Sequence, residues 1–370
     1  MQQTISILPF VFRQTDHREE INAFQSRIPS AEFCALPDNT IMENQQFEYY
    51  VFSPSVTKTY NRAIILLHGL NERSWDKYQD WANDLASNCD CPIILFPIAF
   101  HINRSPKTWS TPRWIMPWLD RRKEQVADST NSTFANLALS SRISNSPLRF
   151  YTSGRESAFN LIQLSKEIIS GKHPLFHKGS GIDFFAYSIG ALLAEVVLIA
   201  DRQKIFRNSK LFSFCGGSTF EKMNGNAKDI LDKEAYSRLQ EYYTSQFING
   251  EHHKQYPGLF VNDDLEMAFK SMISRDRFRE KRIAFFNNAA ERIKILTLKK
   301  DSVIPTRGAQ EAVGTELENK LVEELDFPFE YTHQIPFPQH NKIPLKDREE
   351  SFRMVFDRAA AFLLGTEAKC

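Results

Sequence analysis

Short apolar runs alternate along this chain with longer stretches in which apolar residues recur at helical spacing. The apolar runs have the length of strands and lie at residues 62–67, 91–97, 181–187, 210–215 and 292–298. Helical spacing marks residues 74–88, 153–170 and 347–364. Strands that are apolar on both sides fit a parallel sheet with helices on both faces. The pattern therefore predicts an α/β fold with a mostly parallel central sheet.

The run at residues 181–187 is followed by Ser188 and then by a helix-like apolar stretch. Strand, serine and helix follow one another in this way in a nucleophile elbow, whose tight turn needs small neighbours such as Ala186 and Gly190. Such a turn presents the Ser188 hydroxyl beside the first amides of the new helix. Taken alone, the motif fits equally well a serine that only caps the helix.

Two later segments offer an acid and a base for this serine. Asp301 follows the run at 292–298, where a carboxylate can orient an imidazole. His340 lies in a loop-like stretch before the terminal helix, and histidine exchanges a proton near neutral pH. His333 is the competing base, but we place it inside a last strand, where alternation turns its side chain into the core or into solvent. The pattern favours His340.

With these segments the chain resembles the α/β-hydrolase superfamily over roughly residues 45–364. The order Ser188, Asp301, His340 matches the order of serine, acid and histidine in that superfamily. Two departures are Ala186, where the elbow commonly has glycine, and a long insertion after residue 97.

The resemblance extends to the run at 62–67, which ends in a His-Gly turn. It implies an oxyanion hole formed by the backbone amides of Ile189 and Leu70, or of Asn71 if the loop is shifted. It also implies that His68 braces this loop and takes no part in the chemistry.

Two segments are longer than the connections that a minimal sheet of this kind needs. Residues 101–150 are predicted as a long loop insertion because prolines interrupt them, and residues 218–290 as a helical cap insertion. The remaining parts are a leading segment at 1–60 and a hydrolase core at 61–217 and 291–370. Both insertions should cover the carboxyl ends of the strands, where ligands bind in open α/β sheets. Candidate pocket residues are His68, Asn71, Tyr187, Trp109, Trp114 and Trp118.

The aromatic residues fit core packing as well as they fit a pocket. Arginines between residues 104 and 122 could hold a substrate carboxylate. Solvated arginines on an irregular loop are the alternative that we favour, and residues 129–146 are predicted to form a mobile loop.

The charge and the cysteine content of the chain argue against several classes of partner and cofactor. With 46 basic and 45 acidic residues the net charge is +1, which gives no electrostatic footprint for nucleic acid. No apolar run approaches the roughly 20 residues that cross a bilayer. Five cysteines without C-x-x-C spacing indicate neither a disulfide framework nor a zinc site. The start of the chain lacks the features of a signal peptide. We therefore expect a cytoplasmic protein that needs no metal or cofactor.

These observations lead to one main hypothesis. The chain is predicted to be a serine hydrolase that cleaves an ester, thioester or amide of a small acyl substrate through an acyl-enzyme intermediate. The alternative is a non-catalytic binding or scaffold protein of the same fold, since fold alone does not fix function.

Overall fold

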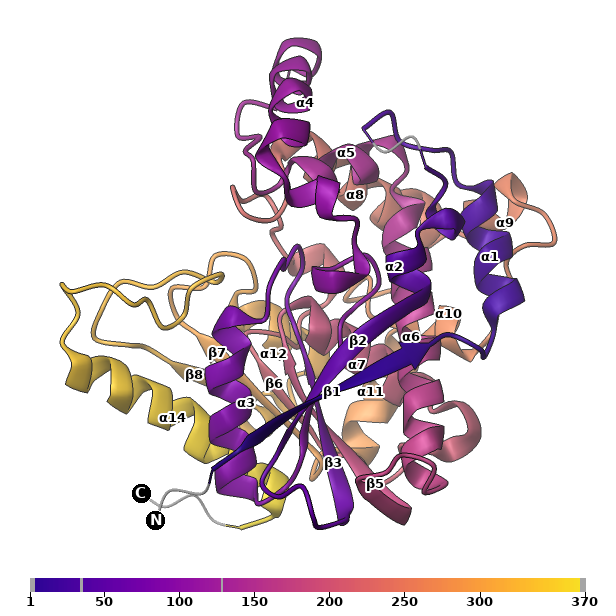
Figure 1. The fold of residues 1–370 in the computed structure, drawn as a ribbon. Coiled ribbons are helices and arrows are strands. Elements are labelled where there is room, and N and C mark those ends of the chain that lie inside the picture. Colours follow the sequence, from indigo (N-terminus) through magenta and orange to yellow (C-terminus); the bar gives the residue numbers. More distant parts are fainter. Residues whose placement is uncertain (1–3, 34–35, 128, 367–370) are drawn as a thin grey trace.

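An eight-stranded sheet forms the centre of the computed structural model, which describes residues 4–33, 36–127 and 129–366 (Figure 1). The strands are β1 (Ser6–Arg13), β2 (Gln46–Ser53), β3 (Tyr60–Leu67), β4 (Ile93–Leu95), β5 (Phe176–Tyr187), β6 (Leu211–Phe214), β7 (Ile293–Leu298) and β8 (Val322–Leu325). Their order in the sheet is β1-β2-β4-β3-β5-β6-β7-β8. β2 is antiparallel to both neighbours, and the other pairs are parallel. The predicted fold class is confirmed.

Helices fill the connections between these strands. They are α1 (Arg18–Arg27), α2 (Met42–Gln45), α3 (Asp76–Cys89), α4 (Pro112–Gln125), α5 (Leu137–Asn145), α6 (Leu148–Ile169), α7 (Ile189–Ala200), α8 (Lys233–Glu241), α9 (Glu251–Gln255), α10 (Asp264–Ser271), α11 (Arg279–Asn288), α12 (Thr306–Val313), α13 (Glu318–Leu321) and α14 (Leu345–Leu364). Within the described residues, no helix combines the length and the apolar character that crossing a membrane requires.

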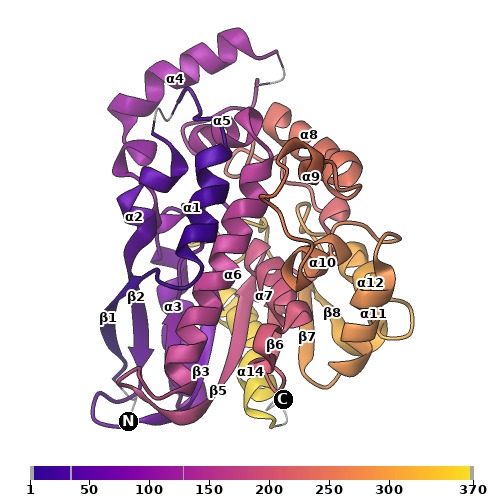
Figure 2. The same cartoon turned by 90° about the vertical axis from the view of Figure 1, so that its right-hand side faces the viewer.

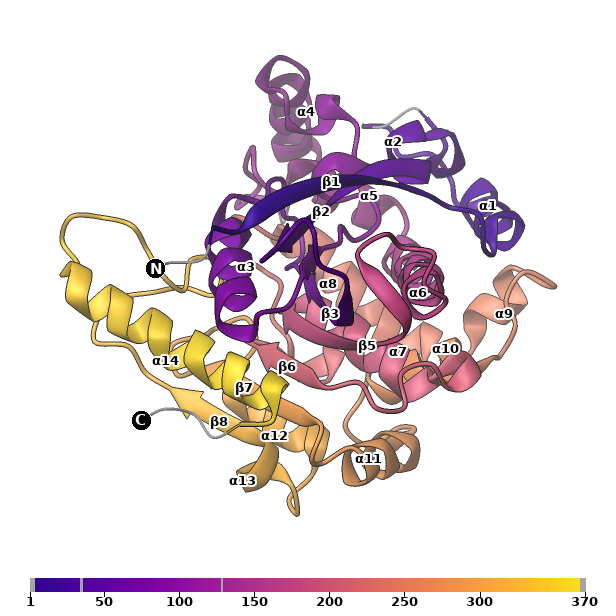
Figure 3. The same ribbon diagram turned by 60° about the horizontal axis from the view of Figure 1, so that its bottom comes forward.

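The sheet separates two apolar cores. Because successive side chains of a strand point to opposite faces, the neighbours Phe184 and Phe185 of β5 enter different cores. Phe184 packs on the side of α6 and α7. Phe185 packs with Trp81 of α3 and stacks on Phe356 of α14. Figure 3 shows α3 and α14 on one side of the sheet and α6, α7 and α11 on the other.

The segment 101–150 differs from its prediction, because it is largely helical. Pro112 begins α4 at a position where its missing N–H costs nothing, and Pro117 lies inside that helix. The expected mobile loop at 129–146 contains α5. Helices α4, α5 and α8 lie together at one end of the molecule (Figure 2). We call residues 101–146 and 220–241 the roof.

One aspartate joins the two parts of the roof. Asp232 caps α8 by accepting a hydrogen bond from the Ala235 N–H at 3.0 Å. Its carboxylate also accepts from Arg122 at 2.5 and 2.9 Å and from the Ser132 hydroxyl at 2.6 Å. The helices further along, α10 and α11, pack beside α7 within the core on that face of the sheet. The first part of the 218–290 segment is therefore the part that belongs to the roof.

Candidate active site

Ser188 occupies a strained turn between β5 and α7. Its φ of 57° and ψ of −124° are unusual for a residue with a side chain, as expected of a serine at a nucleophile elbow. The turn is possible because its neighbours are small. A Cβ on Gly190 would lie 2.8 Å from the carbonyl oxygens of Leu67 and His68, so α7 passes directly over the end of β3.

Three side chains form a hydrogen-bonded chain at this turn. The Ser188 hydroxyl lies 2.7 Å from Nε2 of His333, and Nδ1 of His333 lies 2.7 Å from Oδ2 of Asp301. The other carboxylate oxygen of Asp301 accepts from the N–H groups of Val303 and Ile304 at 2.8 and 2.9 Å. Ser188, His333 and Asp301 are each at most 5% exposed. A hydroxyl, an imidazole and a fixed carboxylate in this order can perform nucleophilic catalysis.

The choice of His340 as the partner of Ser188 is therefore wrong. The last strand, β8, ends at Leu325, and residues 326–344 form a loop, so the last strand in which we placed His333 is absent from this segment. His333 lies on this loop, where strand alternation does not apply, and its ring turns toward Ser188. His340 is exposed further along, and its Nδ1 accepts a hydrogen bond from the Lys342 N–H at 3.1 Å.

The loop that carries His333 is held by two residues that the sequence reading did not assign to this task. Tyr187 donates its hydroxyl proton to the backbone carbonyl of His333, and its ring stacks on the imidazole. Lys77 donates to the carbonyl of Gln334 at 3.0 Å, while forming an ion pair with Glu72. No sequence motif marks these residues, because each acts through a backbone carbonyl of a distant loop.

Leu70 and Ile189, whose backbone amides the resemblance assigns to an oxyanion hole, line both cavities near the site. Ile189 is the first residue of α7, so its amide is free of helical partners. In the described part of the chain, neither amide donates a hydrogen bond. Both amides are therefore free to donate to another group.

The loop that bears Leu70 is fixed from two sides. The Tyr78 hydroxyl accepts from the Gly69 N–H at 2.9 Å and donates to Glu72 at 2.7 Å. Asn71 donates to the carbonyls of Ala135 and Asp229, both at 2.8 Å, and so ties this loop to both parts of the roof.

His68 is fully buried behind the same loop. Its Nε2 accepts from the Ile98 N–H at 2.9 Å, and its Nδ1 lies 2.8 Å from the Gly69 carbonyl. Burial holds its pKa well below the ordinary value, so the ring is neutral and Nδ1 is the donor. These contacts suit the bracing role that the resemblance implies for it.

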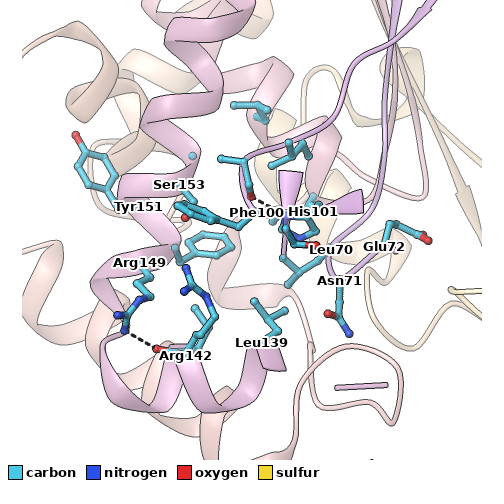
Figure 4. Close-up of a pocket in the computed structure, with 18 of the residues that line it drawn as sticks. Leu70, Asn71, Glu72, Phe100, His101, Leu139, Arg142, Arg149, Tyr151 and Ser153 are labelled. Atoms are coloured by element: carbon cyan, nitrogen blue, oxygen red, sulfur yellow. Dashed lines mark hydrogen bonds between the residues drawn. The ribbon is translucent and has the colours of Figure 1, made fainter. Parts of the chain in front are cut away.

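Two cavities meet at Leu70 and Ile189. The smaller has a volume of about 450 Å³, counting the space that is open to solvent, and is almost entirely apolar. It is lined by Ser188 together with Phe150, Met223, Ile230, Leu231, Leu239 and Val303. The larger has a volume of about 1250 Å³ on the same count. It extends to α5 of the roof and has several charged side chains in its wall (Figure 4).

The six pocket candidates divide in two. Asn71 and Trp109 line the larger cavity. Trp114 is 59% exposed, and Trp118 packs on Phe33 outside both cavities. Tyr187 and His68 lie behind the site and line neither cavity, so these four were wrong as pocket residues.

The arginines that line the larger cavity were not the predicted ones. They are Arg73, Arg142, Arg149 and Arg155. Arg104 and Arg122 of the predicted group are buried in ion pairs with Glu156 and Asp232, and are neither solvated nor part of the cavity.

Two clusters of the described residues have metal-ligand chemistry, with ligand atoms within 4.8 Å of one another. In one, Cys215 lies beside Asp301 and His333, and burial holds its thiol pKa well above the ordinary value. In the other, His252, His253 and Glu266 share a site with the ammonium of Lys270, which lies 2.6 Å from Glu266. The ammonium and the two histidine rings all contact the same oxygen of Glu266, Oε1.

Comparison with known proteins places the chain in a family. The model of a family described as "Family of unknown function (DUF6051)" matches residues 11–364. The chain belongs to this family. No curated protein has a sequence that matches the chain.

Solved structures of similar fold include several esterases. Carboxyl esterase 2 from Tuber melanosporum is 10% identical, with 99% of this chain and 89% of that chain covered and a TM-score of 0.41. A fungal esterase from Rhizomucor miehei is 12% identical, with 98% and 83% covered and a TM-score of 0.44. An acylaminoacyl peptidase from Pyrococcus horikoshii is 10% identical, with 99% and 42% covered and a TM-score of 0.41. Similarity at this level carries no argument about function.

Proposed function

We propose that this protein is a serine hydrolase of the α/β-hydrolase superfamily that cleaves an ester, thioester or amide. The observation that carries the proposal is the hydrogen-bonded chain from Ser188 through His333 to Asp301, at a strained strand-to-helix turn. Each member is buried, so the hydrogen bonds form in a site from which water is largely excluded.

Acylation begins when Nε2 of His333 takes the proton of the Ser188 hydroxyl and Oγ attacks the substrate carbonyl carbon. The negative charge that develops on the carbonyl oxygen is stabilised by the N–H groups of Leu70 and Ile189. Asp301 keeps the His333 proton on Nδ1 and stabilises the imidazolium. The imidazolium then protonates the leaving group, which departs as an alcohol, thiol or amine.

Deacylation repeats these steps with water. His333 takes a proton from the water as its oxygen attacks the acyl carbon, and the same two amides hold the second oxyanion. His333 then returns the proton to Oγ of Ser188, so the acid product leaves and the free hydroxyl is restored. No step draws on a group other than these residues and water.

Each of the two cavities takes the part of the substrate on one side of the reacting carbonyl. The apolar cavity beside Ser188 suits a short hydrocarbon limb, because the polar side chains in its lining are only those of Ser188, Tyr236 and Gln240. In this proposal residues 218–290 and 101–150 serve as insertions on a hydrolase core, and their roof parts shape the two limbs.

A panel of esters, thioesters and amides of C2 to C8 acids, with Ser188→Ala as the control, tests this function. Turnover of at least one class should fall by about 10⁴-fold in kcat for Ser188→Ala. Turnover that persists in Ser188→Ala at the wild-type rate would assign the activity to another group. No turnover by the folded wild-type chain would favour the binding or scaffold alternative.

A further inference from the structure

The larger cavity follows one face of α7 away from the nucleophile. Its wall includes Ile189, Leu192, Leu193 and Val196. These four apolar residues stand at positions i, i+3, i+4 and i+7, which is the spacing of a single helix face. At a rise of about 1.5 Å per residue, the stripe that they form is about 10 Å long. The cavity therefore has an apolar side that begins at the residue after Ser188.

Two further helices border the same part of the cavity. Gly154 and Ala158 line it from α6, and Leu265 and Phe269 line it from α10. In each pair the two residues are four positions apart, so they lie one above the other on the same face of their helix. Small or apolar residues of three helices therefore surround the space along the α7 stripe.

Gly154 leaves open space where a side chain would fit. A Cβ built on it would meet no atom of the described residues around it within 4 Å. Glycine in the interior of a helix is less stable than alanine, and an empty apolar cavity destabilises a core because its lining loses packing contacts. α6 thus has a destabilising residue at a point where any side chain would enter the cavity. A ligand that fills the space accounts for both features.

The charged side chains of the cavity wall already have partners within the protein. The ion pairs are those of Arg142 and Arg149 with Asp38, of Arg155 with Glu20 and Asp263, and of Glu72 with Lys77. The guanidinium of Arg73 donates to the backbone carbonyls of Phe134 and Ala135 at 2.8 and 2.5 Å. A ligand therefore needs no charge of its own to enter, and apolar contact is the main interaction that the stretch along α7 provides.

The larger cavity meets the smaller one beside the reacting serine. Both are lined by Leu70, Phe150 and Ile189, and the smaller one is also lined by Ser188. A substrate whose carbonyl carbon is bound at Ser188 therefore has a short limb in the smaller cavity and its other limb directed along α7.

We infer that the second limb of the substrate is a long apolar chain, which lies along α7 in the larger cavity, where Gly154 leaves room for it. This inference rests on the proposed hydrolase function, of which it names the substrate class. An extended hydrocarbon chain with C–C bonds of about 1.5 Å advances about 1.25 Å per carbon, so about eight carbons span the α7 stripe. Each methylene that leaves water for an apolar site strengthens binding roughly 4-fold.

The first test compares long with short esters in two pairs, since the long limb belongs either to the acid or to the alcohol. One pair is methyl octanoate against methyl butyrate, and the other is octyl acetate against butyl acetate. In at least one pair the long ester should have a kcat/KM roughly 10- to 100-fold above that of the short one, because four more methylenes are buried. A wild type without this preference in either pair overturns the inference.

Gly154→Leu should bring the ratio of long-ester to short-ester kcat/KM close to one, because its side chain fills the space beside α6. Leucine suits a helix interior and the position has room for it, so the fold is retained. Asn83→Leu is the matched control, because Asn83 is exposed on α3, across the sheet from α6, and this variant should keep the wild-type ratio (Figure 3). A preference for the long ester that survives in Gly154→Leu overturns the inference.

A second test does not depend on turnover. Calorimetry on Ser188→Ala should show 1-octanol binding roughly 10-fold or more tightly than 1-butanol, and adding Gly154→Leu should remove this difference. Octanol that does not bind, or that binds with an affinity indifferent to Gly154→Leu, overturns the inference. Octanol binding that depends on Gly154, in a protein that hydrolyses no ester, would leave the apolar site standing and reject the hydrolase.

Discussion

The ring of Tyr187 lies against the imidazole of His333, with centroids 5.4 Å apart and planes 19° from parallel. Its hydroxyl donates to the backbone carbonyl of the same histidine. Tyr187 immediately precedes Ser188, so the strand that presents the nucleophile also holds the base. The spacing between Ser188 and His333 is thereby set by two neighbouring residues of one rigid element.

Removing the Tyr187 hydroxyl should loosen the base. Tyr187→Phe leaves the buried His333 carbonyl without this donor, which should cost about 1–3 kcal/mol of unfolding free energy. We expect kcat to fall about 10-fold with little change in KM, as measured by steady-state kinetics beside a thermal melt. Tyr50→Phe, which removes a hydroxyl bonded to the exposed Glu48, is the control. An unchanged kcat in Tyr187→Phe would mean that the stacking alone positions His333.

Lys77 connects the base loop to the oxyanion loop. It binds the Gln334 carbonyl and Glu72, and its ammonium lies 4.8 Å from the centre of the Tyr187 ring. Lys77→Met removes a contact to each of these loops, so it should lower kcat about 10-fold. The far-ultraviolet circular dichroism spectrum should stay as in the wild type. Lys346→Met, at an exposed lysine of α14, should leave kcat unchanged. Equal kinetics in the two variants would remove Lys77 from the positioning apparatus.

The sheet and the elbow could be predicted because their signals are local. The runs at 62–67 and 181–187 form the ends of β3 and β5, and the turn at Ser188 was marked by the small residues beside it. The base could not be chosen in this way. Phe329 to Gln334 alternates like a strand, but it lies past the end of β8, and tertiary contacts from Tyr187 and Lys77 turn His333 inward.

A substitution at Gly190 tests whether the turn at Ser188 is as tight as the structure shows. A Cβ there would meet two backbone carbonyls and the Leu67 Cβ at 2.8 Å, none of which can move freely. Gly190→Ala should destabilise the fold by about 2 kcal/mol or more. Gly154→Ala in α6, where a Cβ meets nothing within 4 Å, should instead add about 0.5–1 kcal/mol. Chemical denaturation of both variants measures the contrast, and similar stabilities would contradict the close passage of α7 over β3.

Glu195 makes the stability of the fold depend on pH. It is fully buried in α7, and neither carboxylate oxygen is hydrogen-bonded to a residue that the structure describes; burial raises its pKa to about 8. Between the ordinary pKa of 4.5 and about 8 the folded chain holds a proton that the unfolded chain has lost, so stability falls as pH rises.

Glu195→Gln should match the wild type near pH 4.5 and exceed it above pH 8. The difference should be on the order of a few kcal/mol, since one pKa unit is worth about 1.4 kcal/mol. Denaturation at several pH values measures it, with Glu43→Gln on the exposed side of α2 as the control. A variant that is less stable than the wild type above pH 8 would contradict this account of Glu195.

The roof was beyond prediction for a related reason. Prolines at 112 and 117 indicate broken structure, yet Pro112 starts α4 and α5 follows it, because Arg122 and Asp232 join segments more than 100 residues apart. The larger cavity, which reaches α5, depends on the same long-range packing. Its arginines come from three different parts of the chain.

The most direct test of the central claim is the rate at which a neutral alkyl fluorophosphonate labels the folded protein, with the modified residue mapped by mass spectrometry. The wild type should be labelled at Ser188, Ser188→Ala should not be labelled, and Asp301→Asn should be slowed. His333→Ala should lose labelling by about 10⁴-fold, while His340→Ala should react like the wild type. Labelling at another residue, or labelling that depends on His340 and not on His333, would contradict the account.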